Sequence, residues 1–163
     1  MKKIILIALL AVTGNSFAQT SVDGTADVNA EIVKPISITS SGKLDFGSFT
    51  TPETGSGIVT INPADDSRNF SATDMEITSL STFGLPVFTV SKDADATYGV
   101  TVAVTDAPEE TGGSTMTLDQ LTTNINASGN TASSFKVGGR LTVPSTQAVG
   151  IYTGKVTVTV SYE

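Results

Sequence analysis

The amino-acid sequence predicts an all-β fold, an antiparallel β-sandwich. Apolar residues recur at every second position in several segments, most regularly near the two ends of the chain. Successive side chains of a strand point to opposite faces, so this alternation is typical of strands with one buried face. Turn residues separate the segments at intervals of roughly 8 to 12 residues, and no segment has a convincing helical period, which together favour a sandwich of short strands.

The N-terminus has the pattern of an export signal. Two lysines precede the apolar run Ile4–Val12, and Ser16-Phe17-Ala18 has the small-x-small form of a signal peptidase site. We expect a signal peptide over residues 1–18, cleavage after Ala18, and one mature domain, Gln19–Glu163. No apolar run approaches the roughly 20 residues that span a bilayer. The protein is therefore expected in the periplasm, at the cell surface or outside the cell, without a membrane-spanning segment.

Composition narrows the possible functions. Removal of the two N-terminal lysines changes the formal net charge from -7 to -9. Such an acidic chain has no basic stripe that would neutralise phosphates, so nucleic acid is not an expected partner. The sequence contains no histidine and no cysteine, which excludes Ser-His-Asp triads, cysteine nucleophiles and zinc sites with nitrogen or sulfur ligands. We expect a protein that is not an enzyme and that holds no cofactor or metal.

The first patterned stretch after the export signal covers residues 21–32. One parity is apolar or small and consists of Val22, Gly24, Ala26, Val28, Ala30 and Ile32. An extended strand aligns these positions, whereas a helix would scatter them, so we expect a strand whose apolar flank is covered. Asp23-Gly24 equally fits a turn, which would leave residues 19–24 as a loose arm. Pro35 then interrupts the ladder because it has no N–H, and the alternation resumes at Ile36.

Shorter segments fill the middle of the chain. A short strand is expected over Leu44–Phe49, where Gly47 marks a bulge or a close backbone approach. Residues 70–80 are ambiguous. Further strands are expected over residues 58–61, 86–90, 98–104, 116–125 and 135–143, the last broken by Gly138-Gly139. Loops are expected over residues 40–43, 50–57, 64–69, 106–113 and 126–131. With the two ends this gives about nine strands, and we predict an immunoglobulin-like antiparallel β-sandwich.

The last stretch, Gly150–Glu163, has the strongest strand pattern. Its inward parity contains Gly150, Tyr152, Gly154, Val156, Val158, Val160 and Tyr162. Threonine, lysine, serine and glutamate occupy the other parity, as expected for a strand with one face in a core. An unpaired strand edge invites pairing with another chain, so both ends of the protein are candidate assembly strands.

Acidic pairs in loops are the remaining chemical candidates. Asp65-Asp66 and Glu109-Glu110 are flanked by turn residues, and such carboxylates most often solvate a loop rather than act on a glycoside. Asp93 and Asp95 match the start of a calcium loop but lack the following glycine and the distant glutamate. The sequence does not decide whether these two residues bind calcium.

Three quoted segments carry a family resemblance. VDGTADVNAEIVKPISIT, LDFGSF and GIYTGKVTVTVSYE resemble a family of exported bacterial domains of unknown function with a predicted immunoglobulin-like fold, over essentially the whole mature chain. Both ends are also similar to chaperone-usher pilin subunits that lack disulfides. In those pilins an N-terminal extension enters a neighbouring subunit, and a periplasmic chaperone holds the last strand before assembly. Gly150 and Tyr162 fall where many such pilins carry glycine and tyrosine, and the resemblance implies that Val156, Val158 and Val160 face the chaperone.

Two functions are consistent with these features. The first is a pilin-like surface subunit of a fimbrium that serves adhesion and assembles with identical subunits by β-strand addition. The second is a self-complemented, monomeric secreted module that recognises glycan or protein through the loops over 50–57, 106–113 and 126–131. The small residues of the N-terminal stretch make self-complementation a serious competitor to strand addition, because burial of Val22, Ala26 and Val28 stabilises an assembly only modestly.

Overall fold

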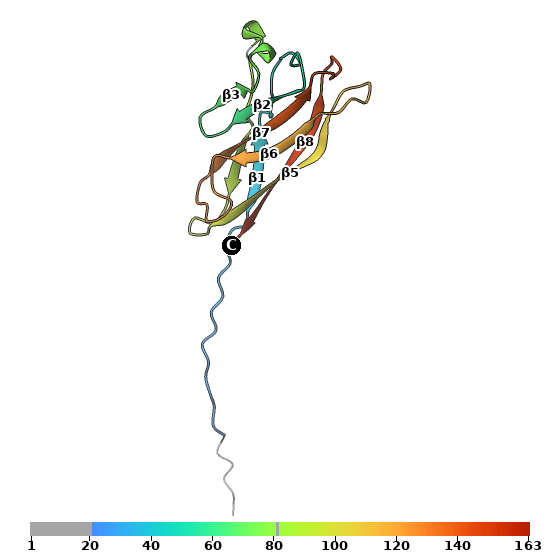
Figure 1. Cartoon of the computed structure of the whole chain (residues 1–163). Coiled ribbons are helices and arrows are strands. Elements are labelled where there is room, and N and C mark those ends of the chain that lie inside the picture. Colours follow the sequence, from blue (N-terminus) through green and yellow to red (C-terminus); the bar gives the residue numbers. More distant parts are fainter. Residues whose placement is uncertain (1–20, 81) are drawn as a thin grey trace, which may run out of the picture. The chain divides into compact units, whose positions relative to one another are not determined.

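The chain forms two sheets of antiparallel strands (Figure 1). The computed structural model describes residues 21–80 and 82–163, so the signal peptide expected over residues 1–18, with cleavage after Ala18, lies outside the described residues. The chain divides into a segment that ends at Ile32 and a domain, Val33–Glu163, and each is described by itself. The strands are β1 (Ser37–Ser41), β2 (Ser56–Asn62), β3 (Ser67–Phe70), β4 (Val87–Ser91), β5 (Tyr98–Glu109), β6 (Thr117–Thr123), β7 (Ser134–Pro144) and β8 (Thr153–Tyr162).

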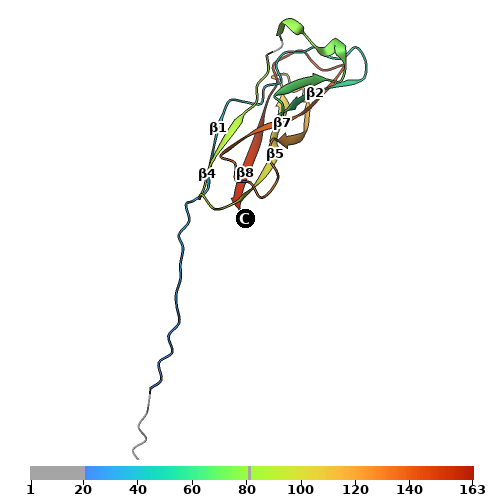
Figure 2. The same cartoon turned by 90° about the vertical axis from the view of Figure 1, so that its left-hand side faces the viewer.

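The larger sheet is built around β7. The first residues of β7 pair with β4, whose other neighbour is β1, and the later residues pair with β2, whose other neighbour is β3. β6 also pairs with β7, with a bulge between Asp119 and Thr122. Figure 2 shows β1 and β4 side by side, with β7 and β2 continuing the same sheet.

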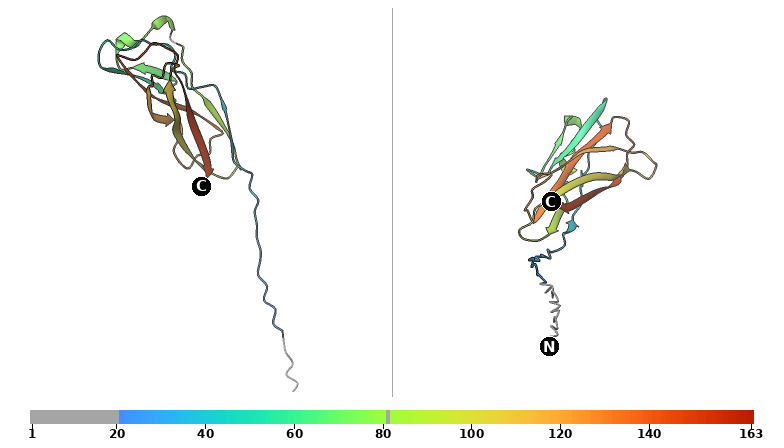
Figure 3. Two further views of the ribbon diagram at one scale, coloured as in Figure 1. Left: turned by 90° about the vertical axis from the view of Figure 1, so that its right-hand side faces the viewer. Right: turned by 90° about the horizontal axis from the view of Figure 1, so that it is seen from below.

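The smaller sheet contains β5 and β8. They lie side by side in every view (Figures 1 and 3) and pair from Tyr98 opposite Tyr162 to Glu109 opposite Thr153. Two bulges interrupt this ladder on the β5 side, between Val104 and Asp106 and between Asp106 and Glu109. The alternation of half-buried and exposed residues along β8 confirms the strand predicted from the sequence, although Gly150–Tyr152 lie before it.

Two apolar clusters form the core. One lies beneath β2 and β7 and contains Val59, Met75, Met116, Leu141 and Val143. The other joins the two sheets, because Val90, Phe135 and Val137 of the larger sheet meet Tyr98 of the smaller one. Phe88 stacks on Phe135 with ring centroids 5.5 Å apart. The β-rich, two-sheet prediction is therefore confirmed, and the described residues form eight strands in place of about nine.

Several predicted elements differ from the structure. Leu44–Phe49 forms no strand, only isolated bridges from Asp45 to Gly84 and from Phe49 to Glu76. The expected close approach at Gly47 is confirmed, since a Cβ there would meet the carbonyl oxygen of Thr82. Leu44–Phe49 forms no continuous strand because Gly47 has a φ of 72°, which turns the backbone out of the extended conformation.

Other differences concern strand lengths. The loop expected over 106–113 begins later, because β5 continues through its bulges to Glu109. The polar run 64–69 contains most of β3, which β2 holds by pairing despite its poor strand pattern. β7 is not broken at Gly138-Gly139, because ladders on β2 and β6 hold both glycines in the sheet.

The strand predicted over 21–32 is wrong for the single chain. Residues 21–36 carry no strand, and Val22, Val28 and Ile32 are 90%, 91% and 98% exposed. A β-strand needs a partner for its backbone groups, and nothing in the described chain provides one for this segment.

Gly138 provides a test of the packing of β7. A Cβ at this position would meet the carbonyl oxygen of Ile61 and lie 2.7 Å from Cδ of Pro63. Gly138→Ala should therefore lower the free energy of unfolding by about 2 kcal/mol or more, measured by urea denaturation. Gly24→Ala, where no atom lies within 4 Å of the added carbon, should leave it unchanged. Equal stability of both variants would contradict this packing.

Candidate assembly interface

The most distinctive feature of the domain is the free edge of β8. This strand of 10 residues pairs with β5 on one side, and no described residue pairs with its other side. The N–H and C=O groups along that side therefore have no strand partner in the domain. A long edge of this kind is a ready template for an added strand.

The inward side chains of β8 are only half covered. Val156, Val158, Val160 and Tyr162 are of intermediate exposure, in alternation with exposed outward residues. Val158 and Val160 pack on the cluster that contains Tyr98 and Phe135. The inward row thus belongs to the core but remains partly open to solvent. Burial of its apolar surface by a segment beside β8 would stabilise the pair by about 25 cal/mol per Å².

The edge of β5, by contrast, is protected at both ends. At one end Tyr98 and Asn130 exchange two backbone hydrogen bonds of 3.1 Å, and the side chain of the buried Asn130 also donates to the Tyr98 carbonyl. At the other end Met116 N–H donates to the carbonyl of Pro108 over 2.8 Å. The bulges near Asp106 add to this protection, since bulges and proline are common means of blocking an edge.

β8 has none of these protective features. Its sequence contains no proline, its only charged residue is Lys155, and the extra residues of the bulges lie on the β5 side. The two strands therefore differ in a way that points to β8 as the edge left available for pairing. Sequence reasoning had identified the inward row of β8 but could not show that the opposite edge of the sheet is blocked.

The glycines and Tyr152 selected from the sequence have structural roles at the start of β8. A Cβ on Gly154 would lie 2.7 Å from the Asp106 carbonyl oxygen and 2.9 Å from the Pro108 nitrogen, so this glycine lets β8 approach the bulge of β5. Gly150 lies beside the side chain of Glu110. Tyr152 packs against the cluster beneath β2, and its hydroxyl donates to the Ala148 carbonyl over 2.7 Å.

Tyr162 connects the end of β8 to the start of the domain. Its hydroxyl donates to the carbonyl of Lys34 over 2.6 Å and accepts a hydrogen bond of 2.7 Å from the N–H of Asp93. Lys34 also donates from its N–H to Asp93 Oδ2 and from Nζ to Ser91 Oγ, at 3.3 and 2.7 Å. We call this set of contacts between Lys34, Ser91, Asp93 and Tyr162 the Lys34 clamp.

The sequence-predicted residues of the N-terminal stretch, Val22, Ala26 and Val28, are all exposed. They retain the alternation expected of an added strand, in which main-chain hydrogen bonds give affinity and alternate side chains fill the surface beneath.

The acidic pairs have local roles. Asp93 Oδ1 accepts from the N–H of Asp95 at 3.3 Å, and its Oδ2 belongs to the Lys34 clamp. Glu110 accepts hydrogen bonds from the N–H groups of Gly112 and Ser114 within its loop. Over residues 21–80 and 82–163 no three acidic, histidine or cysteine side chains gather as candidate metal ligands. In the same residues no helix has the length and apolar character of a transmembrane span.

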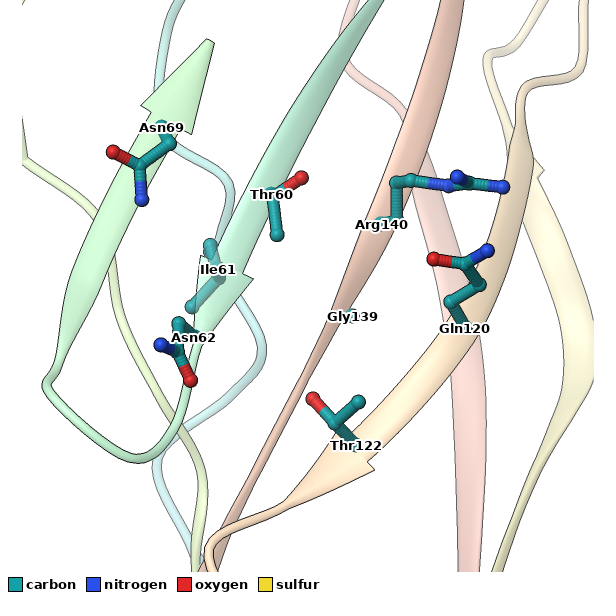
Figure 4. A pocket seen from close by; sticks show the side chains of 8 residues that line it. All are labelled: Thr60, Ile61, Asn62, Asn69, Gln120, Thr122, Gly139 and Arg140. Carbon is teal, nitrogen blue, oxygen red and sulfur yellow. The ribbon is translucent and has the colours of Figure 1, made fainter. Parts of the chain in front are cut away.

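A shallow polar hollow of about 380 Å³ lies on the larger sheet (Figure 4). It spans β2, β3, β6 and β7 and was not predicted, because its residues are brought together only by strand pairing. The lining residues are Thr60, Ile61, Asn62, Asn69, Gln120, Thr122, Gly139 and Arg140. Gln120 has a φ of 44° in the bulge of β6, a left-handed conformation that is costly for a residue with a side chain. Hydroxyl and amide groups of this kind can bind neutral polar ligands.

An ion pair neutralises the charge at the rim of this hollow. Arg140 donates two hydrogen bonds to Asp119, from Nε to Oδ1 at 2.8 Å and from Nη2 to Oδ2 at 3.0 Å. These bonds lower the pKa of Asp119 below its ordinary value of 3.8, and desolvation acts in the opposite direction. Because the bidentate pair leaves no free positive charge, the hollow is not built to bind an anion.

The ion pair predicts a pH-dependent contribution to stability. A carboxyl group whose pKa is depressed on folding stabilises the protein above its unfolded pKa, and this stabilisation is lost as the pH falls through the folded value. Asp119→Asn should therefore be less stable than the natural protein at pH 7, and the difference should shrink below pH 3.8. Thermal unfolding over this range measures both effects.

Asp106→Asn is the control for this prediction. Its carboxylate lies 3.7 Å from Lys155 Nζ and the side chain is 64% exposed, so this pair should contribute little at any pH. A constant difference between Asp119→Asn and the natural protein from pH 7 to pH 2 would contradict the role of the ion pair.

Comparison with known proteins places the chain in a family. The family model described as Domain of unknown function (DUF4402) matches residues 36–162, and the chain belongs to this family. The matched region contains all eight strands and ends with β8, whereas the exposed segment before Ile36 lies outside it. No curated protein and no solved structure is significantly similar to the chain.

Proposed function

We propose that the protein is a non-catalytic, exported structural subunit, pilin-like in its assembly, that forms a surface fibre or adhesive structure by β-strand addition. The added strand is the 21–32 segment of another copy, and its acceptor is the free edge of β8. The observation that carries this proposal is the combination of an open β8 edge with an exposed, alternating segment on the same chain.

The order of the strands supports this proposal. An immunoglobulin-like sandwich places strands A, B, E and D in one sheet and C, F and G in the other. The pairings β1–β4, β4–β7 and β7–β6 match A–B, B–E and E–D, and β5–β8 matches C–F. The β2–β3 hairpin is then an insertion between A and B. In this assignment the position of strand G, beside β8, is free among the described residues, and an added strand would take it.

The chemistry of the two surfaces is complementary. The exposed segment offers small and medium apolar side chains at alternate positions, and the β8 row offers valines that are half covered. Because the apolar side chains of the segment are small, backbone hydrogen bonds along the strand would provide most of the specificity. Before assembly the same edge would need a temporary cover, and a periplasmic chaperone that supplies a strand is the partner we propose for it.

Changes in the exposed segment test this function. Deletion of Gln19–Val28 should abolish multimers and leave a folded domain. Val28→Asp should have the same effect, because it places a charge on the apolar parity of the added strand. Multi-angle light scattering of the chain with its export signal removed would measure the assembly state.

Asn29→Asp is the matched control for Val28→Asp. It adds the same charge at the neighbouring position, on the parity that would face solvent. Multimers should form with Asn29→Asp and not with Val28→Asp. Multimers of unchanged size from the deleted chain would refute strand addition by this segment.

A second candidate function is recognition of a neutral glycan at the polar hollow, by a secreted monomer. The observation that favours it is the positive φ of Gln120, because strained residues cluster at ligand sites. A screen of neutral oligosaccharides should then find a ligand that the natural protein binds and Gln120→Ala does not. Binding that persists in Gln120→Ala, or is absent from the natural protein, would exclude this function.

A further inference from the structure

The Lys34 clamp fixes the point where the exposed segment joins the domain. Lys34 is held through its N–H, its carbonyl and its Nζ, by Asp93, Tyr162 and Ser91 respectively. Tyr162 is the last residue of β8. The segment that precedes Lys34 therefore joins the domain at the C-terminal end of the strand whose edge is free.

This attachment determines how the segment could pair with β8 of its own chain. If residues 21–32 followed their own β8, their last residues would lie beside Tyr162 and their first residues nearer Thr153. The two strands would then run parallel, the less stable arrangement per residue. The segment is long enough for this self-pairing, because 12 extended residues at about 3.3 Å each can follow the 10 residues of β8.

Self-pairing also requires the chain to reverse direction before it enters the domain. β1 leads away from the clamp, and with Lys34 held in place the reversal must fall on Glu31–Val33. Ile32 and Val33 are β-branched and this stretch contains no glycine, proline, asparagine or aspartate, so it is a poor turn. Release of the clamp would move the turn to Lys34-Pro35, which suits it better.

We propose that the Lys34 clamp is a device against self-complementation, which keeps the 21–32 segment from its own β8 and leaves it for another copy. This inference rests on the proposed strand addition. It explains why the segment pairs with β8 of another copy rather than with β8 of its own chain. A segment from another copy can approach β8 antiparallel, without a tight turn and without loss of any contact of the clamp. Tyr162 is the positioning residue, since its hydroxyl joins Lys34 to Asp93.

Removal of one hydroxyl group tests the proposal. Tyr162→Phe keeps the ring that contributes to the inward row and removes both hydrogen bonds of the hydroxyl. The ratio of monomer to multimer should rise at least about fivefold, because the loss of even one hydrogen bond of ordinary net strength has that effect. Light scattering of the mature chain at several concentrations measures this ratio, and thermal unfolding verifies that the domain is folded.

Tyr152→Phe is the matched control. Tyr152 is also half-buried, and its hydroxyl also donates to a backbone carbonyl, that of Ala148 in the loop before β8. It has no contact with the clamp, so its variant should retain the monomer ratio of the natural protein. Equal ratios in Tyr162→Phe and the natural protein, or equal increases in both phenylalanine variants, would overturn the proposal.

A second variant tests the proposal without a change to Tyr162 or to the core. Val33→Gly puts a residue that turns readily next to the clamp, at a position that is 49% exposed and lies on the parity opposite the apolar row. Self-pairing should become easier, so this variant should also form more monomer. An unchanged ratio would count against the proposal.

The location of the segment separates this inference from the proposed function. The chain has no cysteine, so Asn29→Cys and Thr159→Cys introduce unique thiols. Chains that carry one cysteine each should form mixed disulfide dimers in the natural background, whereas Tyr162→Phe with both cysteines should form more disulfide within one chain. If mixed dimers form but Tyr162→Phe does not increase the disulfide within one chain, the proposed role of the Lys34 clamp is refuted and strand addition is not. Absence of any multimer from the natural protein would refute both.

Discussion

The structure depends on the pairing of β5 with β8. This ladder holds a two-stranded sheet against the larger one, and the clusters around Tyr98 and Phe135 join the two layers. Pairing with β5 satisfies one side of β8, while its other side and its inward valines remain accessible. A domain with this arrangement is folded but has one incomplete sheet, and that incompleteness is the basis of the function we propose.

The contrast between the two edges of this sheet shows that the incompleteness is selective. Asn130 and the bulges near Asp106 block β5, and among residues 21–80 and 82–163 nothing comparable blocks β8. A protein that only needed to avoid aggregation would protect both edges. The proposed Lys34 clamp adds a second level of selection, because it controls which copy of the 21–32 segment can reach the accessible edge of β8.

The sequence was sufficient for the all-β class with antiparallel sheets and for β8, since a strong two-residue period is a local property. It failed where tertiary pairing decides the outcome: β3 lacks a strand pattern but pairs with β2, and Gly138 and Gly139 lie in a strand because they pair with β6 and β2 respectively. Residues 21–32 have the pattern of a strand but no partner, so the pattern alone could not place them. The polar hollow around Gln120 was missed because its residues meet only through the pairing of β2, β3, β6 and β7.

Hydrogen exchange at β8 tests the central claim most directly. A chain that lacks residues 19–33 would be measured alone and with a synthetic peptide of those residues. Strand addition predicts that the β8 amides on the free edge exchange rapidly without the peptide and become protected when it is added, while amides bonded to β5 change little. Rapid exchange that the peptide does not alter would contradict the account.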